Sequence, residues 1–508
     1  MRLSLALFCV FSPPCKPIVE TAQYTWRHIP FVWDRDPAWS VNPVSNSSAT
    51  RRQMRTERQS AAHVNKPRPP ASKPFPVRLL TMAHLHPAVS KGGAEIAAYQ
   101  LHNTLRSSPE VEASWFLAAS GGRVSARLGA RLSQPFGANE YVYAGAGFDH
   151  FTHSNPDPEW PVELARLLEE LRPNVVHLHH YTNFGVDTLL TIRRVLPEAH
   201  IVVTLHEYLA ICNHFGQMVK RPGMALCDRS SPRDCNRCFP ERSEQDFFLR
   251  ELFIKRFFRM VDHFISPSQF LADRYIAWGI APSRITVIEN GVPDAPSLPT
   301  RPRRADTPLS IGFFGQISRL KGIDVLFDAA EILEEAGITG IHIDVHGDHS
   351  GQPPEFRALF EARLANAPKN VHVHGPYEND RVHSLMRSVD AVIVPSVWWE
   401  NSPLVIQEAF LARRPVISSD IGGMAEKVRN GVDGFHFRAG NARSLAALLT
   451  ELSAQPDRLL ALDRTLARPL TLHQTSASTL ALYRACSVRA AADADGRTIP
   501  ALPEMQLA

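Results

Sequence analysis

Short apolar segments alternate with helix-length segments in two separate runs of this sequence, and this alternation restricts the fold more than any other feature. In the first run the predicted strands are 77–82, 175–179 and 201–205, and the predicted helices are 94–106, 161–171 and 187–195. Strands that alternate with helices of about ten to fifteen residues are typical of a doubly wound parallel sheet. The first run therefore predicts an α/β domain, for which we take the bounds 76–292.

A proline-rich segment, 293–308, separates the two runs. Its five prolines prevent a regular helix or sheet, so we interpret it as an interdomain linker. In the second run the predicted strands are 309–314, 341–346, 371–374, 391–395 and 415–418. The sequence thus predicts two Rossmann-like domains in series, the second at 309–468, and a C-terminal helix at 469–488 that packs back on the first. Because open parallel sheets bind ligands at the carboxyl ends of their strands, the domains should face each other across a cleft.

The net charge of +4 is unevenly distributed. Residues 1–75 contain eleven Lys and Arg but four Asp and Glu, a net +7, which leaves −3 for residues 76–508. The slightly negative charge of residues 76–508 argues against nucleic acid as a partner, because binding nucleic acid needs a concentrated basic face. Residues 1–75 lack apolar periodicity, so we expect them to be disordered or to precede the true start of translation. We also expect disorder at 489–508.

Cysteine content and apolar runs bear on location. Seven cysteines, an odd number in a long chain, favour the reducing cytoplasm over a disulfide framework. The apolar run 3–11 is shorter than the roughly 20 residues that a membrane-spanning helix needs. The segment 247–265 reads as one amphipathic helix with basic side chains. It either covers the first sheet or contacts a membrane surface, which would place the protein at the inner face of the membrane.

The segment 394–410 contains the most informative candidate ligand-binding residues. A strand ends near Pro395, and either Asn401 or Ser402 is predicted to cap a following helix that has Pro403 in its first turn. The N-terminus of that helix should face the cleft and favour a phosphate group. Glu400 precedes the helix and Glu408 lies inside it, where carboxylates accept hydrogen bonds from hydroxyl groups. The pattern suits a sugar nucleotide, although spacing alone also allows two acids on a solvated helix.

Several motifs together resemble the large family of retaining glycosyltransferases with the GT-B fold, the type called family 4 or glycosyl transferases group 1. The resemblance rests on Glu400-x7-Glu408 and on the segments 311–326 and 417–426. Further matching pieces are Gly92–Glu95, Thr204–Glu207, Ile288–Val292, His346–Gly347 and Asn430-Gly431-x-x-Gly434. The matches keep the family order across about residues 77–485.

The resemblance implies roles for the residues that match. Lys321 corresponds to the lysine that pairs with the donor diphosphate, Glu408 to the carboxylate on the nucleotide ribose, and Glu400 to the acid that contacts the transferred sugar. His206 corresponds to the histidine beside the reacting sugar, so His206 and Glu400 are the catalytic candidates. The full set of expected donor-binding residues is Gly92, Gly93, Arg319, Lys321, Tyr377, Asn401, Ser402, Leu404 and Glu408. Gln316 stands where many relatives carry an arginine of the diphosphate clamp, which leaves Arg319 as its substitute.

What the resemblance implies is a transferase without a catalytic cofactor. It would move a sugar, with retention of configuration, from a nucleoside-diphosphate sugar to a glycan or lipid-linked acceptor in polysaccharide or glycolipid synthesis. Two alternatives remain open: a catalytically silent scaffold or carbohydrate-binding protein, which Gln316 favours, and a sugar-nucleotide epimerase of the same fold. A nicotinamide-dependent dehydrogenase is disfavoured, since only Gly92–Gly93 follows the first strand in place of Gly-x-Gly-x-x-Gly.

Four cysteines lie close together in the sequence, at Cys212, Cys227, Cys235 and Cys238. The final Cys-x-x-Cys pair has the spacing of two thiolates that chelate one metal ion, and four sulfur ligands suit zinc or an iron–sulfur cluster. We therefore predict a structural metal site, with disulfides and unlinked thiols as the alternatives. The group follows His206 closely, so it would stiffen the loop on the acceptor side of the cleft.

Overall fold

The computed structural model describes residues 76–90, 92–124, 130–145, 147–221, 223–294 and 307–494, the last seven as backbone alone. The predictions for residues 1–75 and 495–508, and for most of the proline-rich linker, lie outside the described residues. All the elements below belong to one compact unit, Ser72–Ala508.

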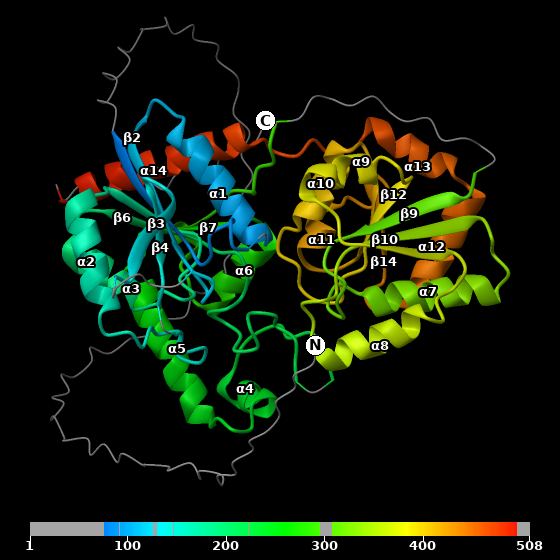
Figure 1. The fold of residues 1–508 in the computed structure, drawn as a ribbon, viewed down its shortest axis with the longest axis horizontal. Coiled ribbons are helices and arrows are strands. Elements are labelled where there is room, and N and C mark those ends of the chain that lie inside the picture. Colours follow the sequence, from blue (N-terminus) through cyan, green and yellow to red (C-terminus); the bar gives the residue numbers. More distant parts are fainter. Residues whose placement is uncertain are drawn as a thin grey trace, which may run out of the picture. The chain divides into compact units, whose positions relative to one another are not determined.

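The first domain contains an eight-stranded sheet with the order β3-β4-β2-β1-β5-β6-β7-β8 (Figure 1). Its strands are β1 Val77–Ala83, β2 Val111–Ala119, β3 Leu132–Gly137, β4 Glu140–Tyr143, β5 Val175–Leu178, β6 His200–Thr204, β7 His263–Ser266 and β8 Ile285–Val287. Its helices are α1 Gly93–Arg106, α2 Trp160–Leu171, α3 Thr188–Val195, α4 Pro232–Cys238, α5 Glu244–Phe258 and α6 Gln269–Trp278. Neighbouring strands pair in parallel, apart from the edge pair β3 and β4, which is antiparallel.

The second domain contains a six-stranded parallel sheet with the order β11-β10-β9-β12-β13-β14. Its strands are β9 Leu309–Phe314, β10 Ile341–His346, β11 Val371–Gly375, β12 Ala391–Val394, β13 Val416–Ser419 and β14 Gly434–Phe437. Its helices are α7 Ile323–Glu335, α8 Pro354–Leu364, α9 Val382–Met386, α10 Leu404–Leu411, α11 Gly422–Lys427, α12 Ala442–Ala454 and α13 Asp457–Ala461, and α14 Leu472–Ala494 follows them.

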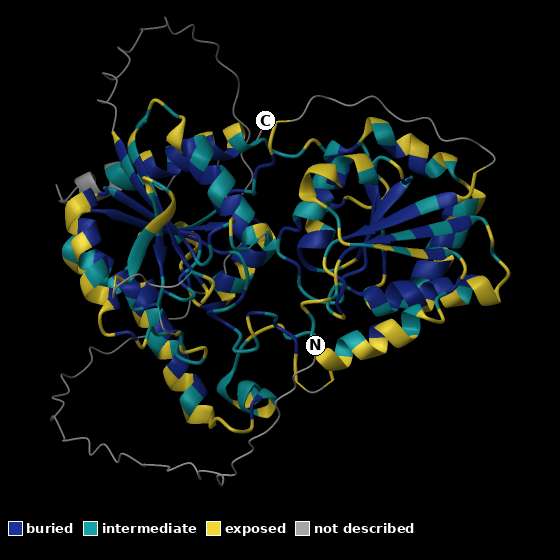
Figure 2. Cartoon of the chain, in the orientation of Figure 1, coloured by how far each residue is buried: buried dark blue, intermediate teal, exposed yellow. Residues whose placement is uncertain are grey.

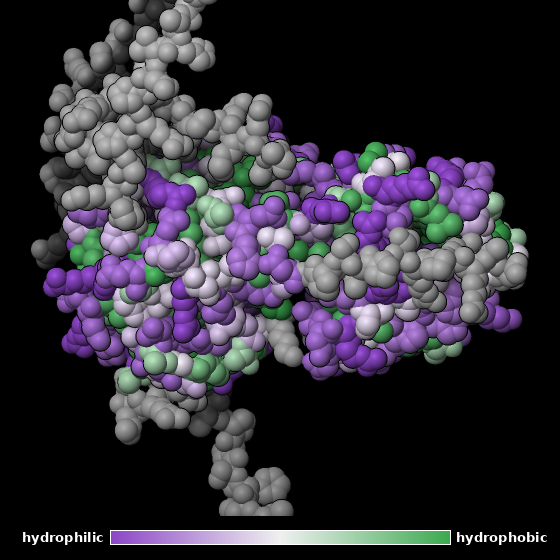
Figure 3. Space-filling view, turned by 90° about the horizontal axis from the view of Figure 1, so that it is seen from above, coloured by the Kyte–Doolittle hydropathy of each residue, from purple (hydrophilic) through white to green (hydrophobic). Residues whose placement is uncertain are grey.

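Both sheets have helices on both faces, which is why central strands such as β1, β5, β9 and β12 are nearly continuous apolar runs. The strands β10 and β11 at one edge of the second sheet alternate instead. In β1, Val77 and Leu79 pack toward α1, whereas Leu80 and Met82 pack toward α2 in a separate core cluster. Figure 2 shows the same layering in burial, with dark blue strands between helices whose outer faces are exposed. On the face seen in Figure 3, hydrophilic side chains predominate and hydrophobic ones are scattered among them. Two doubly wound α/β domains in series are thus confirmed.

The prediction of one helix over 247–265 is wrong in its second half. Helix α5 ends at Phe258, and His263–Ser266 form the buried strand β7. The chain enters the sheet because the Asp262 N–H donates to the Ile201 carbonyl, while the Asp262 carboxylate accepts from the Ile201 N–H at 2.7 Å. The spacing of the apolar residues was interpreted as helical throughout, so α5 and β7 were predicted as one helix.

Helix α5 nevertheless exposes an apolar edge. Phe248, Leu249 and Leu252 are each about half exposed, at 53%, 53% and 49%. Contact of this edge with a membrane surface stays a prediction. Within the part of the chain that the structure describes, no helix combines the length and the apolar character that crossing a bilayer requires.

Helix α14 follows the second domain and packs on the first sheet. Leu480, Leu482 and Tyr483 join the core cluster that contains Val77 and Val175. The Tyr483 hydroxyl lies 2.7 Å from Nδ1 of His177, in the buried middle of β5. The last helix therefore ties the end of the second domain to the first sheet.

We expect Tyr483→Ala to lower the free energy of unfolding by about 3–5 kcal/mol, because it removes a fully buried aromatic ring. Tyr483→Phe removes only the hydroxyl that meets His177 and should cost about 1–3 kcal/mol. Urea unfolding followed by circular dichroism measures both. Arg484→Ala is the matched control: its partner is the surface residue Glu110, so we expect a loss of about 0–1 kcal/mol. A Tyr483→Ala variant as stable as this control would contradict the packing role of α14.

Candidate functional site

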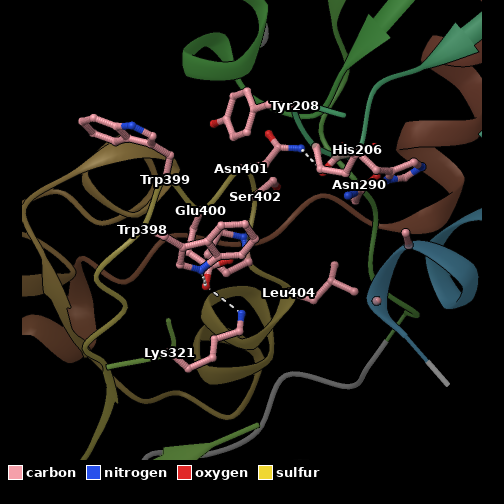
Figure 4. Close-up of a pocket in the computed structure, with 14 residues that line it drawn as sticks. His206, Tyr208, Asn290, Lys321, Trp398, Trp399, Glu400, Asn401, Ser402 and Leu404 are labelled. Carbon is pink, nitrogen blue, oxygen red and sulfur yellow. Dashed lines mark hydrogen bonds and ion pairs between the residues drawn. The ribbon is translucent and has the colours of Figure 1, made fainter. Parts of the chain in front are cut away.

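A pocket of about 200 Å³, open to solvent, lies where the two sheets present the carboxyl ends of their strands (Figure 4). Its lining from the first domain is Gly93, Ala94, His206, Glu207, Tyr208 and Asn290, and its lining from the second is Lys321 and the segment 398–404. The first group comes from the start of α1 and from the loops after β6 and β8. The second comes from the loops after β9 and β12. This is the position at which doubly wound sheets bind ligands.

Helix α1 begins in the wall of the pocket, where Gly93 and Ala94 contribute to the lining. Gly92 occupies the N-cap position in an extended conformation, and Gly93 is the first helical residue. A Cβ atom at Gly92 would lie 2.3 Å from Oε2 of Glu95, so the glycine leaves room for that carboxylate to fold back over the helix start. Gly93 lies against Leu404, where an added Cβ would stay at an ordinary 3.6 Å from Cδ1.

Glu95 is held in its ionised form. Burial opposes its charge, but Nε2 of His84 at 3.2 Å, the Ser90 hydroxyl at 3.0 Å and the residue's own backbone N–H outweigh it, and the pKa of Glu95 falls to about 2. A helix N-terminus with this fixed negative charge beside it is a constrained element and not a flexible turn.

Lys321 and Glu400 form the charged centre of the pocket. The Lys321 ammonium lies 2.6 Å from Oε1 of Glu400, as the dashed line in Figure 4 marks. Oε1 also accepts from the Ser396 hydroxyl at 2.8 Å and from the Trp398 indole N–H at 2.9 Å. Because Glu400 is buried, these donors are needed to stabilise its charge. The pair places a cation and a carboxylate side by side on the second-domain wall.

Asn401 connects the pocket to the first domain. Its Oδ1 accepts from the Ser268 hydroxyl at 2.6 Å, and its Nδ2 donates to the His206 carbonyl at 3.2 Å. The prediction that Asn401 or Ser402 caps the next helix is therefore wrong. Helix α10 begins at Leu404 with Pro403 in the N-cap position and no side-chain cap, because the Asn401 side chain is engaged across the domain boundary. The Ser402 hydroxyl is buried and has no hydrogen-bond partner among the residues that the structure describes.

His206 lies at the end of β6, in the pocket wall of the first domain. Its Nε2 is 3.1 Å from Nδ1 of His179. Burial lowers the pKa of His206 to about 3, so the ring is neutral at physiological pH. A neutral imidazole in this position can exchange hydrogen bonds with a bound hydroxyl but carries no charge for a phosphate.

Seven of the residues predicted from sequence meet in this pocket: Gly93, His206, Lys321, Glu400, Asn401, Ser402 and Leu404. Four others are not part of its lining: Gly92, Arg319, Tyr377 and Glu408. Arg319 is 56% exposed and pairs with Asp324 at 3.5 Å. Burial and the nearby Glu408 raise the pKa of Tyr377, and burial raises the pKa of Glu408 to about 7. Their roles stay predictions.

The pocket also contains residues that the sequence did not single out. Glu207, Tyr208 and Asn290 extend its first-domain wall, and Trp398 and Trp399 its second. The signals in the sequence were adjacency to His206 and Glu400 and the matched segments 204–207 and 288–292. Trp399 reaches the cysteine loop, since its indole N–H donates to the Cys227 carbonyl at 3.0 Å.

Two family models match the chain in succession. The model described as Glycosyltransferase Family 4 matches residues 91–296, and the model described as Glycosyl transferases group 1 matches residues 296–465. Among curated proteins, the D-inositol 3-phosphate glycosyltransferase of Thermobispora bispora is 28% identical over 311 residues, 58% of this chain and 66% of that protein. The protein of the same name from Rhodococcus jostii is 28% identical over 303 residues, 57% and 60% of the two chains. These matches span less than two thirds of either relative.

Solved structures share the fold at low sequence identity. Anabaena HepE in complex with UDP and glucose superimposes with a TM-score of 0.54 at 17% identity, over 80% of this chain and 99% of that one. Sucrose-phosphate synthase from Thermosynechococcus elongatus gives a TM-score of 0.53 at 16% identity, over 82% and 98%.

Two doubly wound domains whose strand ends enclose one pocket, together with these structural neighbours, define the GT-B fold. The tandem family matches then specify the group. The chain belongs to the GT-B glycosyltransferases of the family 4 type, which confirms the predicted resemblance.

Cys212, Cys227, Cys235 and Cys238 all line a second, smaller cavity in the loop after β6. They are unlinked thiols in the structure, and burial raises the pKa of Cys212, of Cys227 and, to about 11, of Cys235. Among the described residues, no three His, Cys, Asp or Glu side chains form a group that could hold a metal ion. The thiols therefore converge on one cavity without the arrangement of ligands around an ion, and the metal site stays a prediction.

On the role that the resemblance assigns to Glu408, UDP should bind more tightly as the pH rises through about 7. The ionised carboxylate accepts ribose hydroxyls better than the protonated one, and burial places its pKa near 7. Titration calorimetry with UDP measures the profile. In Glu408→Gln we expect UDP to bind about tenfold more weakly or worse, and the rise in affinity near pH 7 should disappear. Any pH dependence that remains would come from ionisation of the UDP phosphate itself. The exposed Glu355→Gln serves as control, and a Glu408→Gln profile identical to it would refute the assignment.

If the four cysteines hold a metal, protein purified without added metal should contain about one zinc, or iron with sulfide, per chain by elemental analysis. Cys235→Ser with Cys238→Ser should abolish that content and lower the melting temperature, and a chelator should do the same to the parent protein. Cys486→Ser, on α14, is the matched control and should keep the metal. Metal-free protein whose melting temperature the chelator leaves unchanged would rule the site out.

Proposed function

We propose that this protein transfers a sugar from a nucleoside-diphosphate sugar to an acceptor hydroxyl. The observation that carries the proposal is the Lys321–Glu400 pair, which stands opposite the start of α1 and His206 in one pocket. A cation and free backbone N–H groups suit a diphosphate, while a buried carboxylate suits sugar hydroxyls. Family membership supports the same activity.

In the proposed reaction the main electrostatic task is to stabilise the departing nucleoside diphosphate. Negative charge grows on this group as its bond to the anomeric carbon breaks. Lys321 supplies a point charge, and the N–H groups at the start of α1 supply fixed dipoles from the other wall. Glu400 hydrogen-bonds to hydroxyls of the transferred sugar and so orients it. When the donor enters, the diphosphate competes with Glu400 for the ammonium group of Lys321.

We further propose that transfer retains the anomeric configuration, with the acceptor hydroxyl attacking from the face that the diphosphate leaves. The complexes of Anabaena HepE with UDP, glucose and UDP-glucose support a uridine nucleotide as the first donor to test. The names of the curated relatives make D-inositol 3-phosphate the first acceptor to test. A role in polysaccharide or glycolipid assembly, at the cytoplasmic face of a membrane, is the setting that we propose, with the exposed edge of α5 as its support.

A second candidate, a carbohydrate-binding protein without transferase activity, has one observation in its favour. Gln316 replaces the expected arginine, and Arg319 turns outward to Asp324. The diphosphate would then rely on one side-chain cation, Lys321. Sugar binding without nucleotide release would identify this alternative.

Purified protein with UDP-glucose and D-inositol 3-phosphate should release UDP and form a glycoside with the donor's anomeric configuration, read by nuclear magnetic resonance. We expect Lys321→Ala and Glu400→Gln to lower kcat/KM by about tenfold to hundredfold each, the value of a lost charged hydrogen bond. Lys369→Ala, an exposed lysine of the same domain, is the control. A panel of other nucleotide sugars and acceptors extends the test, and absence of nucleotide release across the panel would reject the proposal.

A further inference from the structure

Glu207 is a carboxylate in the pocket wall to which no role has been given. It follows His206 directly at the end of β6, and its side chain is 29% exposed. Its main chain is fixed, because the Tyr275 hydroxyl donates to the Glu207 carbonyl at 2.9 Å. Glu207 belongs to the first domain and so faces Lys321 and Glu400 from the acceptor side of the pocket.

The hydrogen bonds around Glu207 define which atoms carry protons. The Thr182 backbone N–H donates to Nδ1 of His180 at 3.0 Å, so Nδ1 is an acceptor and the proton of the neutral ring sits on Nε2. Nε2 lies 2.9 Å from Oε1 of Glu207 and donates to it. The Leu209 backbone N–H donates to Oε2. Two N–H donors, one on each oxygen, form a cradle for an ionised carboxylate.

The loop beyond β6 is shaped around this carboxylate. Gly216 has a φ of +69°, and a Cβ atom there would lie 2.3 Å from Oε2 of Glu207 and 2.7 Å from the Leu209 nitrogen. A side chain at Gly216 would therefore displace either the carboxylate or its backbone donor. The close approach keeps Glu207 in one orientation.

Burial opposes the charge of Glu207 and raises its pKa to about 8, although the Leu209 N–H and His84 act in the other direction. The titratable groups that face it are His84 after β1, His180 and Tyr181 after β5, Tyr208 beside it, and Tyr275 on α6. Burial lowers the pKa of His180 well below its usual value and raises those of the three tyrosines. These four groups are therefore neutral near pH 8, where Glu207 changes charge.

We propose that Glu207 accepts the proton of the acceptor hydroxyl, with His180 as its positioning residue. The inference rests on the proposed function and adds a residue to it. As the acceptor oxygen bonds to the anomeric carbon, its proton passes to a Glu207 oxygen. The bond from that carbon to the diphosphate oxygen breaks, and its electron pair leaves with the diphosphate. Glu207 later returns the proton to solvent. A base is most effective when its pKa lies near the working pH, which is the property that burial gives this carboxylate.

The test uses the full chain with UDP-glucose as donor and D-inositol 3-phosphate as acceptor, and follows UDP release between about pH 6 and 9, around the expected titration. For the parent protein kcat should rise with pH through about 8. Glu207→Gln should lower kcat by about a hundredfold or more, the usual contribution of a general base, and should abolish the rise. Its KM for UDP-glucose should change little, because Lys321 and Glu400, the side chains proposed to hold the donor, lie on the opposite wall. Glu207→Asp should restore the pH dependence in part.

His180→Ala separates a positioning role from a merely structural one. Without the Nε2–H donor the ionised form of Glu207 is less stable, so the midpoint of the pH profile should move to higher pH as kcat falls. A structural defect alone would lower activity and leave the midpoint in place. Glu241→Gln, an exposed glutamate of the following loop, is the matched control and should behave like the parent.

The outcomes separate the two levels of the proposal. An active parent protein whose pH profile is unchanged in Glu207→Gln would overturn this inference alone and make the departing phosphate the proton acceptor. A parent protein that binds no UDP-glucose in a thermal-shift assay and releases no UDP would overturn the proposed function for these substrates, and the inference with it.

Discussion

The pocket depends on one close backbone contact in the second domain. The Gly423 N–H donates to the Glu400 carbonyl at 2.8 Å, and a Cβ atom at Gly423 would lie 1.5 Å from the Asn401 carbonyl oxygen. Only glycine allows α11 to approach the loop after β12 so closely. The contact fixes the loop so that the Glu400 side chain meets Lys321 and the Asn401 side chain meets the first domain. One steric constraint thus sets both the charged pair and the bridge between the sheets.

Other contacts across the same boundary reinforce that bridge. The Glu426 carboxylate accepts the backbone N–H groups of Gln269 at 2.8 Å and Phe270 at 2.7 Å, the first residues of α6. A carboxylate at a helix N-terminus satisfies unpaired donors and interacts favourably with the helix dipole. Trp399 adds its hydrogen bond to the cysteine loop through the Cys227 carbonyl. The loop that carries the four thiols is therefore mechanically connected to the wall that carries Glu400, although it lies in the other domain.

The sequence predicted many of the elements whose signal is local, although it missed the largely apolar strand β2. The buried runs 309–314 and 341–346 match β9 and β10 residue for residue. It missed β3, whose residues are largely exposed and include Pro135, because an edge strand lacks the apolar run of a central one. The Asn401 cap failed for a different reason: its partners, Ser268 and His206, belong to another domain. Glu207 ends the matched segment 204–207 but received no role, since its ionisation depends on contacts with His180 and Leu209 that residue type and spacing do not reveal.

Two carboxylates on the first domain illustrate how environment assigns different roles to the same residue type. Glu95 is buried, yet donors from His84, Ser90 and its own backbone N–H hold its pKa at about 2. Glu207 is partly buried and has fewer compensating donors, and its pKa rises to about 8. Carboxylates whose pKa values are pushed apart in one site can serve as a permanent charge and as a proton acceptor. In the proposed reaction Glu95 fixes the start of α1 for the diphosphate, whereas Glu207 remains free to exchange a proton with the acceptor. In this proposal, different side chains therefore serve the electrostatics of the leaving group and the proton chemistry of the attacking hydroxyl.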